Sequence, residues 1–208
     1  MFAAPAFHFK DCAFHIAPWT WTLTCGLAKL GIALVALLLP FVEARSLGAT
    51  VGWMLVAGGA TELLLAWRGR SSWVGRLTFG SGAVTLLAGA AIVKSGWADL
   101  FPLAQLITVW LLLRGIMSLD IAIQSRRTPM ANWGWVLARG TADLSLGVLL
   151  LMGAPLAIFT VVIFGQTQAL VTSFYHILAV SFLVAGMGLV SIAVAQRQRH
   201  LTDPFLTS

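Results

Sequence analysis

Six apolar stretches, each about as long as a membrane-crossing helix, follow one another along this chain. An α-helix rises about 1.5 Å per residue, so roughly 20 apolar residues cross the hydrocarbon of a bilayer. A barrel strand would alternate in polarity and be about half as long, so the continuous apolar character favours helices. The stretches lie near residues 21–39, 47–67, 73–94, 103–124, 134–153 and 170–195. The sequence therefore predicts an all-α membrane protein with six transmembrane helices.

The composition agrees with a single compact membrane bundle. Of the 208 residues, 59% are hydrophobic and only 10% are charged, whereas a soluble domain carries about 25% charged residues. The net charge is +6, and the basic residues sit at helix ends, so we expect anionic lipid head groups as partners and no nucleic acid. Residues 1–20 are predicted to be a cytoplasmic or interfacial tail, 21–198 the membrane domain, and 199–208 a cytoplasmic tail.

Lysine and arginine are unevenly divided between the two sides of the predicted helices. If both termini are cytoplasmic, the loops and tails on the opposite side hold only Arg45 and Lys94. The cytoplasmic side then holds Lys10, Arg68, Arg70, Arg76, Arg126, Arg127, Arg197 and Arg199. Cytoplasmic loops are enriched in these residues, so we expect both the N and the C terminus on the cytoplasmic side.

The predicted helices form three similar hairpins, over about residues 21–70, 71–127 and 128–198. The second helices align loosely as LVAGGATELLLAW, LLLRGIMSLDIAI and LVAGMGLVSIAVA. Glycines at helical spacing let backbones approach closely, so their expected role is packing inside the monomer. The stretch from Pro155 to Gly186 is longer than that from Pro40 to Gly59. The extra residues, around 156–168, are expected to form an outer insertion or to extend a helix beyond the bilayer.

With these features the chain resembles the HdeD-like family of small bacterial acid-resistance membrane proteins, over about residues 20–198. The resemblance rests on the three-hairpin repeat, on turns at Pro40 and Pro155, and on basic helix exits. It also rests on the motifs GGATE at 58–62, RGIMSLD at 114–120 and LARG at 137–140. Repeat two lacks the turn proline. The resemblance implies a non-enzymatic, multi-pass protein of the bacterial inner (plasma) membrane, associated with acid or general stress tolerance, and it supplies no chemistry.

Two other functions stay open at this point. One is a small proton- or solute-conducting channel or transporter, although repeats that run in the same sense are unlike the inverted repeats of alternating-access transporters. The other is an accessory subunit of a larger membrane complex. A homo-oligomer or a membrane-protein partner is compatible with each of these functions.

Ionisable residues inside the predicted helices are the candidate functional residues. A charge at the centre of a membrane helix costs roughly 2.5–3.5 kcal/mol on insertion scales, so pairing is expected. Arg139 and Asp143 are four residues apart and are predicted to pair within their helix, whereas Arg114 and Asp120 need partners elsewhere. The candidate network consists of Lys29, Glu62, Arg114, Asp120, Arg139 and Asp143.

This candidate network has two interpretations. It handles protons or a small solute from the cytoplasmic side, or it is a neutralised brace that fixes helix register. Three positive and three negative residues give zero net charge, which favours the brace. Charges that converge on a water-filled cavity would indicate transport, and closed pairs would indicate a structural role.

His176, beside Tyr175, is expected near the outer surface of the last helix. Histidine changes charge close to physiological pH, so His176 is a candidate sensor of external acid. The remaining histidines lie in the tails without ligand spacing, and Cys12 and Cys25 form no CxxC pair, so no metal site is expected. The chain has no P-loop, HExxH or GxSxG motif, and we therefore expect no catalytic residues and no cofactor.

Overall fold

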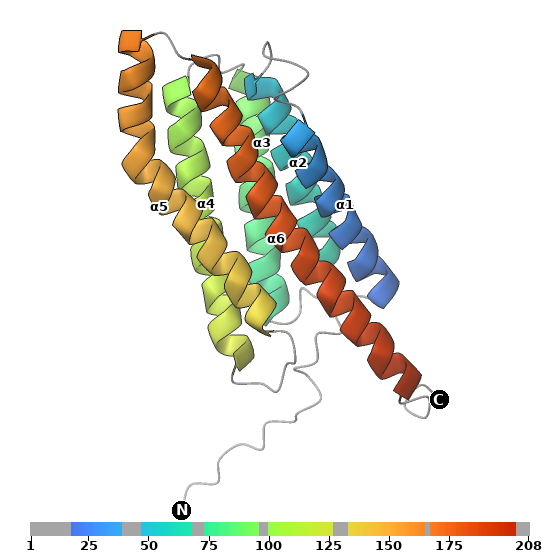
Figure 1. Cartoon of the computed structure of the whole chain (residues 1–208). Helices are drawn as coiled ribbons and strands as arrows, with labels where there is room; N and C mark the ends of the chain where they lie inside the picture. Colours follow the sequence, from blue (N-terminus) through green and yellow to red (C-terminus); the bar gives the residue numbers. More distant parts are fainter. Residues whose placement is uncertain are drawn as a thin grey trace, which may run out of the picture.

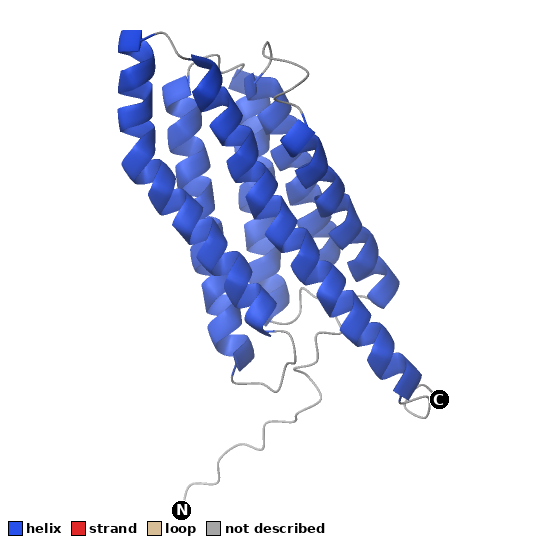
Figure 2. Cartoon of the chain, in the orientation of Figure 1, coloured by secondary structure: helices blue, strands red, loops and turns tan. Residues whose placement is uncertain are grey.

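The computed structural model describes residues 18–38, 47–67, 73–95, 100–126, 133–164 and 167–202, and all of these except Pro18 are helical (Figure 1, Figure 2). Each helix is long and apolar enough to cross a membrane. The prediction of an all-α membrane protein with six transmembrane helices is confirmed. The helices are α1 (Trp19–Leu38), α2 (Leu47–Trp67), α3 (Trp73–Ser95), α4 (Leu100–Arg126), α5 (Trp133–Phe164) and α6 (Thr167–Thr202).

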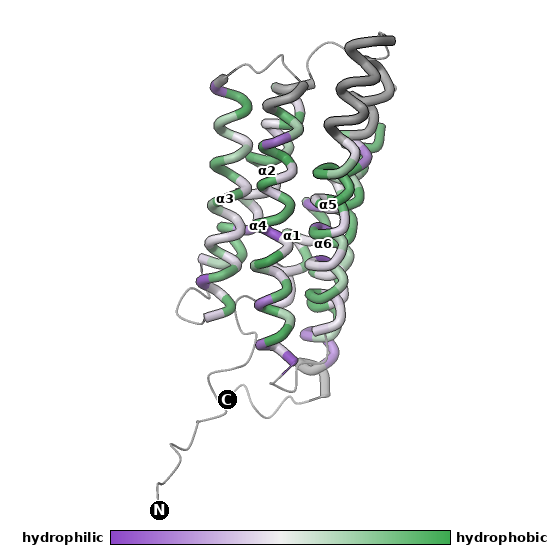
Figure 3. The backbone as a smooth tube through the Cα atoms, turned by 90° about the vertical axis from the view of Figure 1, so that its left-hand side faces the viewer, coloured by the Kyte–Doolittle hydropathy of each residue, from purple (hydrophilic) through white to green (hydrophobic). Residues whose placement is uncertain are grey.

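The outer surface of the bundle is apolar. Figure 3 shows hydrophobic residues along all the helices, with few hydrophilic ones away from their ends. Large side chains such as Trp53, Leu87, Leu149 and Met152 are exposed. A soluble protein rarely exposes apolar surface of this extent, whereas a helix in lipid satisfies its own backbone and turns apolar side chains outward. The chain is therefore a multi-pass membrane protein.

The helices form a closed ring of three close pairs. Consecutive helices run in opposite directions, so α1 begins and α6 ends at the same end of the bundle (Figure 1); we call this the terminal end. The most extensive contacts join α2 to α3, α4 to α5, and α6 back to α1. The two helices of each predicted hairpin, α1–α2, α3–α4 and α5–α6, contact each other less extensively. We refer to α2/α3, α4/α5 and α1/α6 as the helix pairs.

Reciprocal glycine contacts hold each helix pair together. In α2/α3, a Cβ on Gly59 would lie 2.5 Å from the backbone nitrogen of Leu86, and one on Gly82 would lie 2.9 Å from that of Leu63. Each glycine thus faces the residue four positions after the glycine of its partner helix. The equivalent glycines are Gly115 and Gly140 in α4/α5, and Gly186 and Gly26 in α1/α6. Helices approach this closely only where no side chain intervenes, so the three pairs share one packing geometry and give the bundle pseudo-threefold symmetry.

The apolar core is unequal at the two ends of the bundle. The larger cluster lies toward the end opposite the termini and includes residues of all six helices, among them Ala36, Leu55, Ile92, Trp110 and Phe182. A small cluster toward the terminal end consists of Cys25, Leu65 and Leu189, with Trp21 packed against it. Between these clusters the interior of the bundle is polar.

Arginine side chains stack on tryptophan rings at the terminal end. The distance from guanidinium carbon to ring centroid is 5.3–5.6 Å in each case. One such contact occurs in each helix pair: Arg76 on Trp73, Arg126 on Trp133, and Arg197 on Trp19. Paired aromatic and cationic side chains of this kind suit the boundary between hydrocarbon and water.

The third repeat differs from the prediction at Pro155. This proline was expected to mark a turn, yet α5 continues through it to Phe164, and α6 begins three residues later at Thr167. In lipid, a helix that loses one backbone hydrogen bond at a proline is still more stable than an open turn. The extra residues around 156–168 therefore lengthen both helices, to 32 and 36 residues.

The predicted boundaries are close to those of the helices. α1 starts at Trp19, where the carbonyl of Pro18 accepts hydrogen bonds from the backbone nitrogens of Trp21 and Thr22. α6 extends to Thr202, beyond the predicted limit at 198. Residues 1–17 of the predicted N-terminal tail, the turn proline Pro40 and residues 203–208 lie outside the described residues.

Candidate functional site

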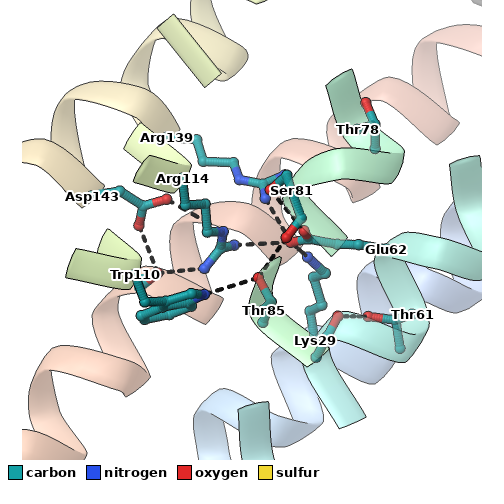
Figure 4. Close-up of polar contacts among 12 residues, drawn as sticks. Lys29, Thr61, Glu62, Thr78, Ser81, Thr85, Trp110, Arg114, Arg139 and Asp143 are labelled. Carbon is teal, nitrogen blue, oxygen red and sulfur yellow. Dashed lines mark hydrogen bonds and ion pairs between the residues drawn. The ribbon is translucent and has the colours of Figure 1, made fainter. Parts of the chain in front are cut away.

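The carboxylate of Glu62, on α2, is the centre of the buried polar contacts (Figure 4). Its Oε1 accepts a hydrogen bond from Nζ of Lys29, on α1. The same oxygen lies 2.6 Å from Nη2 of Arg139, on α5, and 3.1 Å from Nη2 of Arg114, on α4. Its other oxygen, Oε2, accepts a hydrogen bond of 3.0 Å from the hydroxyl of Ser81, on α3. Five helices therefore meet at one carboxylate.

A second carboxylate, that of Asp143 on α5, extends these contacts to the sixth helix. Its Oδ2 lies 3.5 Å from Nε of Arg114, and its Oδ1 accepts a hydrogen bond of 2.6 Å from the hydroxyl of Ser181, on α6. The Ser181 oxygen in turn accepts one of 2.9 Å from Nη1 of Arg114. We call Lys29, Glu62, Arg114, Arg139 and Asp143 the ionic centre.

The ionic centre is buried and contains one more basic than acidic side chain. Lys29, Arg114 and Asp143 are 0% exposed and Glu62 is 1% exposed, while the side chain of Arg139 is 17% exposed. Three basic side chains face two carboxylates, so the formal net charge is +1 when Lys29 is protonated. Because buried charges are stable only when paired and hydrogen-bonded, every member depends on the others.

The ion pairs of Glu62 all cross from one helix pair to another. Glu62 is the acidic member from α2/α3, Lys29 comes from α1/α6, and Arg114 and Arg139 come from α4/α5. Glycine packing holds the two helices within each pair, whereas the ionic centre joins the three pairs to one another. A change in the charge of the ionic centre therefore changes the strength of the contacts between the helix pairs.

Aromatic side chains border the ionic centre on the side away from the terminal end. The guanidinium carbon of Arg114 lies 5.1 Å from the ring centroid of Trp110 and 5.5 Å from that of Phe182. Nε1 of Trp110 donates a hydrogen bond of 2.9 Å to the hydroxyl of Thr85. These rings belong to the larger apolar cluster, so the ionic centre is closed on that side, and Arg139 is its partly exposed member.

Two predicted features of the charge network are wrong. Arg139 and Asp143 do not pair within their helix; Arg139 turns to Glu62, and Asp143 lies against Arg114 and Ser181. Asp120 does not join the ionic centre and accepts hydrogen bonds of 3.1 Å from Gln124, one turn along α4. Arg114 and Asp120 are six residues apart and face different sides of α4, so only Arg114 faces the bundle axis. Without Asp120 the buried charges no longer sum to zero.

His176 lies apart from the ionic centre. It is an exposed residue of α6, two residues into the apolar segment Phe174–Gln198. Within the part of the chain that the structure describes, no group of His, Cys, Asp and Glu side chains could hold a metal ion. The site is thus built from charges and hydroxyl groups.

The hydroxyl-bearing residues of the site, Ser81, Thr85 and Ser181, were not among the residues predicted from the sequence. Ser81 and Thr85 occupy the same places around Gly82 as Arg139 and Asp143 occupy around Gly140. Cys25 and Lys29 stand in the same places around Gly26. In the first helix of each repeat, a thiol, hydroxyl or charged side chain directly before the packing glycine and another charged or hydroxyl side chain three residues after it were therefore a signal in the sequence. No comparable pattern marks Ser181.

Comparison with known proteins gives a family for this architecture. The model of the family described as "Short repeat of unknown function (DUF308)" matches residues 24–94 and 99–152. These segments cover most of α1, all of α2, nearly all of α3, all of α4 and the first part of α5. None of the curated proteins and none of the solved structures matches the chain. Because the matched segments make up more than half of the chain, this protein belongs to the DUF308 short-repeat family.

Proposed function

We propose that this protein is a non-enzymatic protein of the bacterial inner membrane that supports tolerance of acid or general stress, and that proton uptake in the ionic centre is its working step. The stress role is supported by the resemblance to HdeD-like proteins, which belong to the DUF308 family. The proton step is supported by the charge balance of the ionic centre.

The charge balance is the observation that carries the proposal. A guanidinium stays charged in proteins, whereas a lysine can release its proton when buried. With Lys29 neutral, Arg114 and Arg139 balance Glu62 and Asp143; with Lys29 protonated, the ionic centre carries +1. Uptake of one proton at Lys29 therefore changes a neutral buried site into a charged one.

The groups around Lys29 connect that proton to the helix packing. Lys29 contacts Glu62, which also binds Arg114, Arg139 and the hydroxyl of Ser81. Asp143 faces Arg114 from α5, and on α1 itself Cys25 lies one turn before Lys29. A change of charge at this point alters the attraction among all three helix pairs, since coulombic interactions are strong in a buried, poorly polarisable site.

Two substitutions fix the charge of the ionic centre and test the proposal. Lys29→Met holds it at zero, and Lys29→Arg holds it at +1. We expect both variants to reach normal abundance in the membrane and to lose acid survival in cells that lack the native protein. Lys94→Met, an exposed lysine near the end of α3, is the matched control and should survive like wild type. Normal acid survival of Lys29→Met would contradict the proposal.

A second candidate function is conduction of protons or a small solute, because side chains of all six helices meet at the ionic centre. The closed ion pairs, bordered by Trp110 and Phe182, speak against it by the criterion set out above. Liposomes that contain the purified protein test it directly. Acid-dependent flux that disappears in Asp143→Asn would support conduction, and equal background traces for both proteins would contradict it.

We also propose that both termini are cytoplasmic and that the terminal end meets anionic lipid head groups. Arg76, Arg126 and Arg197 lie at that end, each on a tryptophan ring, and cytoplasmic ends of membrane helices are enriched in such cations. A fluorescent reporter that matures only in the cytoplasm, fused after Ser208, should be bright. A dark reporter at normal protein abundance would contradict this orientation.

A further inference from the structure

We infer that the protein holds two molecules of anionic phospholipid, one at the terminal end of α4/α5 and one at the terminal end of α1/α6. Each site combines an exposed arginine, a tryptophan ring and a line of exposed apolar side chains. The inference rests on the proposed contact of the terminal end with anionic head groups and deepens it, because it names two places where a lipid is held and the residues that hold it.

An arginine of one helix stacks on a tryptophan of the other helix in both of these pairs. The guanidinium carbon of Arg126, at the end of α4, lies 5.6 Å from the ring centroid of Trp133, on α5. That of Arg197, on α6, lies 5.4 Å from the ring centroid of Trp19, on α1. Both arginines are exposed. Stacking uses the face of a guanidinium, whereas its N–H donors lie in its plane, so each arginine can still donate hydrogen bonds to a phosphate.

The two arrangements occupy equivalent positions in the repeated fold. Arg126 lies eleven residues after the packing glycine of α4, Gly115, and Trp133 lies seven residues before that of α5, Gly140. The same two offsets separate Arg197 from Gly186 and Trp19 from Gly26. The close packing within a helix pair therefore brings the same two side chains together at the same height in both pairs.

A line of exposed apolar side chains leads from each arginine toward the middle of the helix. The line consists of Val109, Ile116 and Ile123 on α4, and of Val180, Met187 and Val194 on α6. Within each line the spacing is seven residues, close to two helical turns, and the last member lies three residues before the arginine. From Arg126 to Ile116 the helix rises about 15 Å, which is half the thickness of the hydrocarbon. An acyl chain of a lipid whose phosphate meets the arginine can therefore lie along the line.

The chemistry of the two sites selects an anionic phospholipid. A cation at the membrane surface attracts a negatively charged head group, and tryptophan rings are enriched at the level of the head groups. A zwitterionic lipid brings a positive group close to its phosphate, which weakens its attraction to the arginine. A soluble anion would contact the arginine alone and would make no use of the apolar side chains next to it.

The test is native mass spectrometry of the full-length protein in detergent, titrated with phosphatidylglycerol or with phosphatidylethanolamine of the same acyl chains. Each bound lipid is resolved by its mass, so the number of sites is counted directly. We expect two molecules of phosphatidylglycerol to bind with similar affinity, each about fivefold more tightly than phosphatidylethanolamine, from the attraction of one arginine near the membrane surface. Equal affinity for the two lipids would overturn the inference.

Variants locate the two sites. In Arg126→Gln and in Arg197→Gln we expect one lipid to bind as in wild type and the other about fivefold more weakly; the double variant should weaken both. Both arginines are exposed, so their loss should leave the fold intact, and if one variant does not fold the other decides. Unchanged binding in a folded variant would overturn its site.

Arg76→Gln is the matched control, because it removes one positive charge from the same end. Arg76 stacks on Trp73 of its own helix, so it does not join two helices, and this variant should bind both lipids like wild type. If it weakens binding as much as Arg126→Gln does, the lipids respond only to the overall charge, and the two sites are overturned. Glycerol phosphate, a head group without acyl chains, should not displace the lipid; displacement would overturn the part assigned to the apolar side chains.

Failure of this inference can be told apart from failure of the proposed function. Lipid binding is measured on the purified protein, without acid survival and without the reporter fused after Ser208. A bright reporter together with equal binding of the two lipids would keep the proposed orientation and overturn the two sites. A dark reporter together with two arginine-dependent lipids would keep the sites and overturn the orientation.

Discussion

Nη2 of Arg139, on α5, lies 2.6 Å from Oε1 of Glu62, on α2, although the two residues are 77 positions apart in the chain. The contact joins two different helix pairs and brings together elements from the first and third repeats. Glu62 also binds Lys29 and Arg114. Removal of this carboxylate therefore affects the interfaces of α2/α3 with both of the other helix pairs.

We expect Glu62→Gln to destabilise the protein by about 3–5 kcal/mol, because it leaves three buried cations opposite Asp143 alone. The free energy of unfolding in detergent micelles measures the effect. Asp120→Asn is the control, since Asp120 is an acidic residue in the membrane that contacts Gln124 of its own helix and lies outside the ionic centre; its loss should cost less than about 1 kcal/mol. Equal costs for the two variants would contradict the central place of Glu62.

The double variant Glu62→Gln with Arg139→Gln should be more stable than the sum of the two single effects predicts. The two substitutions remove opposite charges and leave the ionic centre at its original net charge. Residues in direct contact show coupling energies of about 0.5–3 kcal/mol, and we expect a value within that range from a double-mutant cycle. Additive effects would mean that the two side chains do not interact.

Asp143→Asn should abolish acid survival and leave protein abundance in the membrane normal. The amide oxygen can still accept the hydrogen bond from Ser181, while the negative charge beside Arg114 is lost. Survival assays and immunoblots of membrane fractions measure the two quantities together. A collapse in abundance would instead assign Asp143 a structural role.

Gly59→Ala should weaken the packing of α2 against α3. Its Cβ would lie 2.5 Å from the backbone nitrogen of Leu86, so the helices must separate, at a cost of about 1–3 kcal/mol. Gly31→Ala is the matched control, because nothing lies within 4 Å of its Cβ position and alanine has the better helix propensity. Thermal midpoints of the two variants should move in opposite directions; a midpoint that does not fall in Gly59→Ala would contradict the close approach.

His176→Gln should leave acid survival unchanged, because His176 is an exposed residue of α6 and lies outside the ionic centre. The same survival assay compares this variant with Lys29→Met. If only the histidine variant loses survival, external sensing at His176 replaces proton uptake at Lys29 as the mechanism.

The helices and the candidate charges could be predicted from the sequence because both depend on local properties. An apolar run of sufficient length has only one stable form in a bilayer, and a charge within it is conspicuous. The sequence accordingly predicts all five members of the ionic centre, and it also predicts that Arg114 needs a partner outside its own helix. These members are Lys29, Glu62, Arg114, Arg139 and Asp143.

The choice of partners could not be predicted, because it depends on how the helices are arranged around the axis. Helical spacing alone favours a pair between Arg139 and Asp143, but the close packing of α4 on α5 places Arg114 next to Asp143, and Arg139 reaches Glu62. The same limit applies to Asp120, whose position in a predicted helix says nothing about the side it faces. Ser181 lies in the site because α6 packs back against α1 and so closes the ring of helices.

The packing of α6 against α1 has a consequence for how the bundle assembles in the membrane. Among the six helices α1 is synthesised before the others, whereas α6, the helix against which it packs most extensively, is synthesised after the others. Until α6 is present, the face of α1 around Gly26 lacks its packing partner, and Asp143 lacks the hydroxyl of Ser181. The sixth helix thus completes the bundle, so a chain cut before α6 leaves the face of α1 around Gly26 without its packing partner.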